Sequence, residues 1–294
     1  MNSKRIIGWL FAAFALLLLP ACSTIKLAYN NAPEFGYWWL DGYVDFQSDQ
    51  SSRAREELSK LLIWHRAEEL PKLAELLQKI QRMTAADIAP AQVCAMFDES
   101  RERYNAVTHQ AESSAVWLVQ SLKPAQLAHM EAKFSKINDQ WRKDWLQLTA
   151  AERFEKRLKS NTERAEEFYG KLEDKQVAAL RGALEASQFD ATQNMTERQR
   201  RQQDLMQTLR KTSGNTTGNA KPAAPEVLAQ LRAYRERVTV SPNATYQAYA
   251  SKLTQESCAS FALLHNSTTP EQRRRAVARL AAYERDVREL NSQR

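Results

Sequence analysis

Cysteine is the residue type with the clearest chemistry in this 294-residue chain, which contains three of them. Cys22 follows a pattern typical of a secretory signal: two basic residues, an apolar run over residues 6–19, and then small residues. The apolar run is shorter than the roughly 20 residues that a bilayer-spanning helix needs, and Pro20 ends it. We therefore expect residues 1–21 to be a removed signal peptide and Cys22 to begin the mature chain.

The residues Leu19-Pro20-Ala21-Cys22 resemble the lipobox of bacterial lipoproteins. In those proteins the cysteine thiolate, a strong nucleophile, takes up a diacylglycerol group, so the resemblance implies that Cys22 carries acyl chains and anchors the protein to a membrane. By the sorting rule of lipoproteins, Ser23 in place of Asp implies the periplasmic face of the outer membrane rather than the inner membrane. The alternative is an ordinary signal peptide followed by a chance cysteine.

The other two cysteines, Cys94 and Cys258, form an even pair in the oxidising periplasm. We expect a disulfide between them, which on the chain-entropy model would stabilise the fold by roughly 5 kcal/mol. The alternative is two buried free thiols, because both cysteines lie on apolar helical stripes.

Motifs for catalysis or metal binding are missing from the sequence. The four histidines, at 65, 109, 129 and 265, include no pair at the spacing of helical metal ligands, and no phosphate-binding or nucleophile motif occurs. The formal charge of +7 falls to +5 without the signal peptide, and arginine-rich runs at 198–201 and 273–275 could meet lipid phosphates or acidic proteins. We expect no enzyme activity, no cofactor, no metal and no nucleic-acid partner.

The body of the chain has the periodicity of amphipathic helices. Apolar residues recur every three or four positions, as in the series Leu127, Met130, Phe134, Ile137, Trp141, Trp145 and Leu148. Seven glycines are too few for a turn-rich β protein. We expect an all-α fold, a multi-helix bundle of long amphipathic helices, with a lipidated tether over 22–33 and a single helical domain over 34–294. The segment 212–225, rich in Gly, Asn, Thr and Pro, is expected to be a flexible loop.

Five short segments share an apolar residue or Thr followed four positions later by an acid or amide, which is typical of a capping box. They are MTAAD (83–87), LKPAQ (122–126), LTAAE (148–152), LEDKQ (172–176) and TTPEQ (268–272). We expect helices to start near 84, 123, 149, 173 and 269.

The same segments resemble the LTxxQ elements of the Spy and CpxP-like periplasmic proteins, small helical proteins that protect unfolded envelope proteins or sense envelope stress. This chain is about twice as long as those proteins, and no copy matches in full. In overall layout the chain resembles a proteobacterial lipoprotein family of uncharacterised function. That family has a lipobox, a Tyr- and Trp-rich segment and a long helical body, and this resemblance implies no activity.

Aromatic residues are concentrated soon after Cys22, in the segment 27–46. Trp38, Trp39 and Tyr43 could lie in the headgroup layer of a membrane, which suits rings with a polar edge. They could equally belong to a short helix that packs on the helical body.

The segment 188–211 has few apolar residues, so we expect it to project into water or to meet a partner. Flexible Met side chains and arginine are common at interfaces, which makes Met195, Met206, Arg200 and Arg201 our candidates for a partner-binding surface. A solvated spacer is the alternative. For the whole chain we expect a lipid-anchored periplasmic protein that binds envelope proteins or unfolded clients. It would act like a chaperone or an envelope-stress protein, or alternatively as a structural scaffold.

Overall fold

The computed structural model describes residues 21–213 and 222–293, and this part of the chain is helical and has no β-strand. The expected all-α class is thereby confirmed. The helices are α2 (Ala21–Asn30), α3 (Ala32–Val44), α4 (Ser48–Trp64), α5 (Leu70–Thr84), α6 (Pro90–Gln110), α7 (Glu112–Ser121), α8 (Pro124–Trp141), α9 (Ala150–Tyr169), α10 (Asp174–Glu185), α11 (Ala191–Thr212), α12 (Ala224–Thr239), α13 (Ala244–Asn266) and α14 (Pro270–Ser292), with π-helical turns at His65–Glu69 and Arg142–Leu146.

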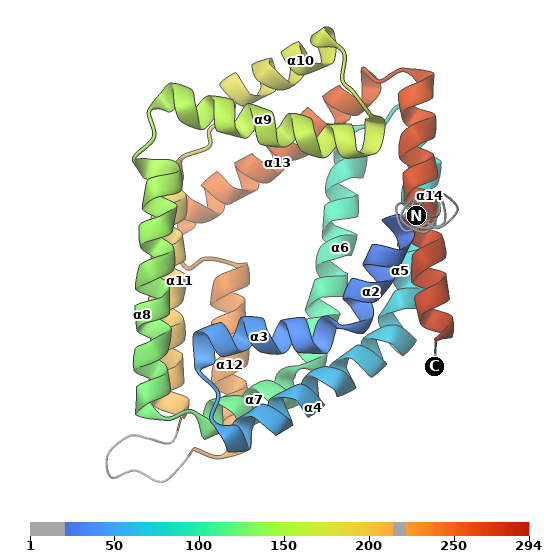
Figure 1. The fold of residues 1–294 in the computed structure, drawn as a ribbon. Coiled ribbons are helices and arrows are strands. Elements are labelled where there is room, and N and C mark those ends of the chain that lie inside the picture. Colours follow the sequence, from blue (N-terminus) through green and yellow to red (C-terminus); the bar gives the residue numbers. More distant parts are fainter. Residues whose placement is uncertain (1–20, 214–221, 294) are drawn as a thin grey trace, which may run out of the picture.

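The helices are arranged as the sides of an open frame (Figure 1). α5 packs along α14 on one side, α8 packs along α11 on the opposite side, and α6 crosses α13 between them. The buried apolar residues of the described chain accordingly form four separate clusters rather than one central core. Each cluster lies where a few helices meet, which leaves faces of several helices directed toward the middle of the frame.

Two of these meeting points have the same architecture, and they lie at the lower left and upper right of Figure 1. The first corner consists of α3, α4, α7 and α8, and the second consists of α9, α10, α13 and α14. In each, the first two helices form a packed hairpin. The first helix of that hairpin packs on the fourth helix of the corner, and the second packs on the third.

A pair of buried glutamines joins the helix starts of the first corner. Gln126 Nε2 donates to Gln50 Oε1 at 2.7 Å, and the reverse bond is 3.3 Å. Each amide also donates across the corner to a backbone carbonyl: Gln50 to Ser121 at 2.9 Å and Gln126 to Asp45 at 3.0 Å. Both N–H donors of each amide are therefore used.

The second corner repeats this arrangement bond for bond. Gln176 Nε2 donates to Gln272 Oε1 at 2.7 Å, and the reverse bond is 3.0 Å. Gln176 also donates to the Ser267 carbonyl at 3.0 Å, and Gln272 to the Lys171 carbonyl at 3.1 Å. In all four cases the carbonyl belongs to the residue five positions before the partner glutamine. The described chain thus contains two copies of one structural unit.

Each paired glutamine is also the third residue of its helix, where its Oε1 accepts from the backbone N–H of the N-cap residue. The four N-cap residues are Gln47, Lys123, Glu173 and Thr269, with N···O distances of 2.9–3.0 Å. This bond satisfies a donor at the start of the helix and positions the amide for its partner.

Four of the five expected helix starts are confirmed, at 123, 149, 173 and 269. The start near 84 is wrong, because Thr84 ends α5 and its hydroxyl donates to the Ile80 carbonyl. α6 begins instead at Pro90, where Gln92 Oε1 accepts from the Ala89 N–H at 2.8 Å. The segment 83–87 has the composition of a capping box, but α5 continues through its first two residues.

The expected tether over 22–33 is corrected by the structure, which makes most of it helical and docks it on the helical body. α2 packs on α14, and Lys26 forms ion pairs with Asp286 and Glu289. Asn30 donates to the side chain of Gln293 at 3.1 Å. These three partners lie more than 250 positions away, so the sequence alone gave no sign that the segment docks on the body.

The predicted signal peptide lies almost wholly outside the described residues, as do the side chain of Cys22 and positions 214–221 of the expected loop. Thr212, at the start of that loop, is still the last residue of α11. Within the described ranges, no helix is both long enough and apolar enough to cross a bilayer.

A disulfide joins Cys94 on α6 to Cys258 on α13, 164 positions apart, with an S–S distance of 2.01 Å. Cys258 is fully buried and packs with Ile88 and Val93. This is the pairing that the sequence favoured over two free thiols. The disulfide links α6, which belongs to neither corner, to α13 of the second corner.

Candidate functional site

Histidines and carboxylates do not gather into a metal site anywhere in the described part of the chain. The buried His265 is held by hydrogen bonds: its Nδ1 lies 2.9 Å from the Tyr169 hydroxyl and its Nε2 lies 2.8 Å from the Ala86 carbonyl. A carbonyl only accepts, so Nε2 carries the hydrogen and Nδ1 accepts from the tyrosine. Burial lowers the pKa of His265 and raises the pKa of Tyr169 to about 12. This neutral pair holds the α5–α6 connection against α13.

One candidate binding surface consists of two adjoining hollows along α13. One, of about 550 Å³, lies between α6, α9, α10 and α13, and the other, also about 550 Å³, lies between α8, α11, α12 and α13. Phe189 and Leu253 line both, and we call the two together the central groove. Its rings are Phe97, Phe134, Trp141, Phe168, Tyr169, Phe189, Tyr234, Tyr246 and Phe261, and its charged residues are Arg157, Arg164, Arg198, Arg201, Glu197 and Glu256.

Arginines and rings are interleaved in the central groove. The distance from the guanidinium carbon to the ring centre is 4.4 Å for Arg157 and Phe189, 5.5 Å for Arg198 and Trp141, and 5.9 Å for Arg201 and Tyr246. Such contacts orient the guanidinium groups over flat apolar surface. With four arginines against two glutamates, the lining combines apolar area with a net positive charge, which suits ligands that are apolar and acidic.

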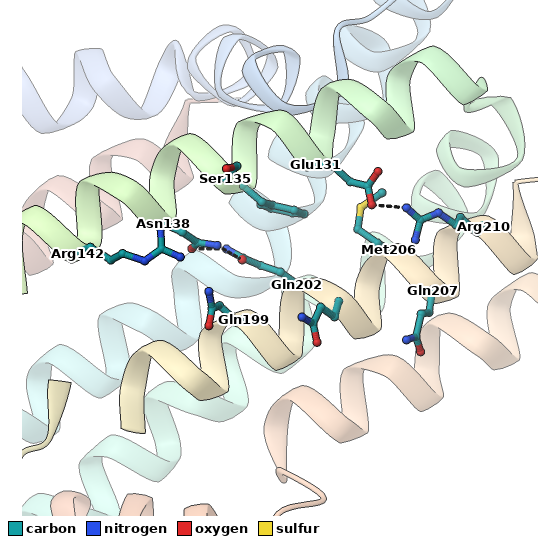
Figure 2. A pocket seen from close by; sticks show the side chains of 11 residues that line it. Glu131, Ser135, Asn138, Arg142, Gln199, Gln202, Met206, Gln207 and Arg210 are labelled. Atoms are coloured by element: carbon teal, nitrogen blue, oxygen red, sulfur yellow. Dashed lines mark hydrogen bonds and ion pairs between the residues drawn. The ribbon is translucent and has the colours of Figure 1, made fainter. Parts of the chain in front are cut away.

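A further pocket, of about 370 Å³, lies between α8 and α11 (Figure 2). Its side chains point toward one another across the two helices: Asn138 donates to Gln202 at 2.7 Å, and Arg210 forms an ion pair with Glu131. Because these polar groups already satisfy each other, a ligand here would gain little from displacing them. The central groove is therefore the better candidate site.

The partner-binding surface expected on α11 is largely corrected by the structure. Met195 and Met206 are each only 4% exposed, so neither can lie on a contact surface. Arg200 is engaged within the fold, where it binds Glu197 and donates to the Arg237 carbonyl at 2.8 Å. Arg201 alone of the four lines the central groove.

α11 does not project into water, because neighbouring helices supply the apolar surface that its own sequence lacks. It packs between α8 and α12, and Met206 and Leu209 join a cluster that includes Val119 and Val227. Its buried carboxylate, Glu197, has a lowered pKa. Burial by itself would raise the pKa of Glu197, but hydrogen bonds from Arg200, Arg201 and Ser241 lower it by more. Polar residues are thus buried in pairs rather than exposed.

The three aromatic residues expected near the membrane divide into two groups. Trp38 and Trp39 on α3 are 59% and 64% exposed, and Phe35 beside them is also exposed. Tyr43 is half-buried and packs against Phe134, 5.9 Å between ring centres. Tyr43 therefore packs against the core, whereas Trp38 and Trp39 lie on the surface.

Two glutamine-containing helix starts, one of them in the first corner, escaped the sequence reasoning. FQSDQ (46–50) and IAPAQ (88–92) have the same apolar-to-glutamine spacing as the segments that we singled out, but each lacks Thr. Requiring only an apolar residue and a glutamine four positions later would have found both. The central groove has no such signal, because its residues come from seven helices and the connection before α11.

The fold defines the class first: an all-α protein built on two similar glutamine-linked corners. Residues 42–219 match the model of a family of unknown function, DUF6279, and because this is more than half of the chain, the protein belongs to that family. This agrees with the expected membership in a family of uncharacterised function. No curated protein and no solved structure matches the chain significantly.

Proposed function

We propose that this protein is a lipid-anchored periplasmic protein that binds other envelope proteins, in a chaperone-like or envelope-stress role, through the central groove. The observation that carries the proposal is the interleaving of arginines and partly exposed rings in that groove. Phe97 and Phe261, for example, are each 41% exposed. Rings that remain exposed in a groove gain free energy when a partner covers them, at about 25 cal/mol per Å² of apolar area.

The resemblance to the LTxxQ proteins supports the same proposal. Three of the four paired glutamines, Gln126, Gln176 and Gln272, come from these segments, so the motif has a common structural task at those helix starts. The chain, which contains two such corners, is about twice as long as those small proteins. It also places a long groove between its two corners.

Anchoring is the second part of the proposal and rests on Cys22 and the exposed rings of α3. Trp38 and Trp39 follow the lipobox cysteine by only 16 and 17 residues. Tryptophan favours the headgroup layer, so these rings would hold the first helices against the membrane that the acyl chains enter.

Substituting the groove rings tests the binding function. We expect the double variant Phe97→Gln, Phe261→Gln to suppress aggregation of an unrelated unfolding protein several-fold less well than the wild type. Its helical content and Tm should change little, because both rings are already partly exposed. Ile63→Gln is the matched control, since Ile63 is 70% exposed and lines none of the pockets described above.

The alternative function, a scaffold without client protection, makes a different prediction. A scaffold would show no suppression of aggregation by the wild type, and affinity capture from membranes would yield one or a few defined partners. Capture that persists in the Phe97→Gln, Phe261→Gln variant would place the partner surface outside the central groove.

The anchor has its own test. Cys22→Ser should abolish acyl labelling and release the protein from membranes, and labelling that persists in this variant would refute the lipobox assignment. In the acylated protein, replacing Trp38 and Trp39 with Ser should leave labelling intact. It should, however, remove the blue shift of tryptophan fluorescence that lipid vesicles induce.

A further inference from the structure

Two half-buried arginines of the central groove lack a close carboxylate partner among the described residues: Arg198, which donates to Asn138 Oδ1 at 3.2 Å, and Arg157. Arg157 on α9 is half-buried, its guanidinium lies 4.4 Å from the Phe189 ring centre, and its Nη2 donates to Ser187 Oγ at 3.0 Å. No carboxylate among the described residues comes within 4.0 Å of it, whereas Arg200 and Arg237 both have close carboxylate partners. Ser187 is neutral, so the positive charge remains uncompensated.

The nearest acidic residue in the lining does not fill this role. Glu256 accepts instead from the Gln188 backbone N–H at 3.1 Å. Burial lowers the pKa of Arg157, and the negative charge of Glu256 offsets this only in part. A buried charge without a partner is costly, so a bound carboxylate would gain both an ion pair and relief of that cost.

The surroundings of Arg157 fit a peptide better than a simple hydrocarbon chain. Phe168, Leu184 and Phe261 provide apolar surface, while Ser260 and Asn161 place polar atoms along the same hollow. A peptide backbone has N–H and C=O groups that need such partners, whereas a fatty acid has none along its chain. Arg164, two helical turns from Arg157 on α9, is exposed at the edge of the hollow and would meet a second acidic residue.

We propose that the central groove binds an apolar peptide segment that carries an acidic side chain, and that the carboxylate of this side chain binds Arg157. The inference rests on the proposed function and names the chemistry of its ligand. Arg157 then provides selectivity for acidic over neutral apolar segments, while the surrounding rings provide most of the buried area.

The test uses a matched pair of fluorescent ten-residue peptides rich in Leu and Phe, blocked at both ends, with a single central Asp in one and Asn in the other. Binding is measured by fluorescence anisotropy with the full-length protein. We expect the Asp peptide to bind the wild type about tenfold more tightly than the Asn peptide, which corresponds to about 1.4 kcal/mol. In Arg157→Gln the two peptides should bind equally, at the level of the Asn peptide with the wild type. Arg285→Gln, which removes an exposed arginine on α14, should preserve the tenfold preference.

The outcomes separate this inference from the proposed function. Equal binding of both peptides by the wild type would overturn the role of Arg157 and leave peptide binding intact. No binding of either peptide, together with unimpaired activity of the Phe97→Gln, Phe261→Gln variant, would overturn the proposed function itself. Complete displacement of the Asp peptide by a stoichiometric amount of a fatty acid would show that the groove is a lipid site and would also refute the proposal. The comparison of two peptides on the wild type needs no variant to fold.

Discussion

The two corners of the frame share one hydrogen-bonded device but differ in what surrounds it. In the first corner, the Gln50–Gln126 pair is backed by the largest apolar cluster, which includes Val44, Leu122 and Leu127. In the second corner, polar and covalent links are added. Asn266 forms hydrogen bonds with both the N–H and the carbonyl of Ile88, and His265 bonds the Ala86 carbonyl. The disulfide at Cys258 lies about two turns before His265 on α13. The paired amides therefore set the geometry in both corners, while the surroundings set how strongly each corner is held.

The extra links of the second corner follow from its position in the chain. The α5–α6 connection crosses to this corner, where Asn266 and His265 hold it. The paired glutamines are also 76 positions apart in the first corner and 96 in the second. Because the entropic cost of loop closure grows only with the logarithm of length, this difference adds only about 0.2 kcal/mol, far less than the added links contribute.

Removing the disulfide should have the largest effect on this comparison. In Cys94→Ser, Cys258→Ser, we expect the free energy of unfolding to fall by about 2–5 kcal/mol, because the bond constrains a 164-residue separation in the unfolded chain. Urea unfolding without reductant measures the loss. Hydrogen exchange should rise more in α13 and α14 than in α3 and α8, and a uniform rise would show that the two corners form a single cooperative unit.

Breaking one glutamine pair should cost somewhat less. Gln176→Ala and Gln126→Ala should each lower the free energy of unfolding by about 2–4 kcal/mol, since each leaves a buried amide and a part-buried carbonyl without their partners. Gln92→Ala is the matched control, because Gln92 makes the same bond to its N-cap but is exposed. Its cost should stay below about 1 kcal/mol. If all three variants lose the same stability in thermal unfolding, the amides act only as helix caps.

Acidification should weaken the second corner before the first. Burial keeps the pKa of His265 below 6.5 in the folded protein, so below pH 6.5 the unfolded chain takes up a proton that the folded one does not. The stabilisation is complete above pH 6.5 and is lost as the pH falls toward the lowered pKa, by at most about 1.4 kcal/mol per pH unit. Unfolding at pH 7 and pH 5 measures the change, which His265→Gln should reduce and His129→Gln, at an exposed site in the first corner, should retain. An imidazole titration by NMR near the ordinary pKa would contradict it.

The smallest difference lies in the helix caps. Thr269 Oγ1 accepts from the Gln272 N–H at 3.2 Å, so Thr269→Ala should cost about 1 kcal/mol in the second corner. Lys123, at the equivalent position of the first corner, makes no such bond to its helix, and Lys123→Ala should change the unfolding free energy by less than about 0.5 kcal/mol. Equal costs for the two variants in urea unfolding would show that the threonine hydroxyl adds nothing to this cap.

Helix positions and most helix starts were predictable because the forces that determine them act within a few residues. The three-to-four residue spacing of Leu127, Met130 and Phe134 identified α8, and capping at Thr149 and Thr269 identified the starts of α9 and α14. The failure at Thr84 has the same origin. A local motif there was overruled when α5 continued to pack on α14.

By itself, the sequence determined the all-α class, the capped helix starts and the cysteine pair, since composition, periodicity and an even number of remaining cysteines are enough for these. Only the tertiary structure decided that Gln50 pairs with Gln126 and Gln176 with Gln272, that Met195 and Met206 are buried, and that Arg157 faces a groove without a carboxylate. These outcomes depend on contacts between residues many helices apart. The spacing of residues along the sequence does not reveal whether a side chain faces water or another helix, or whether a charge has a partner.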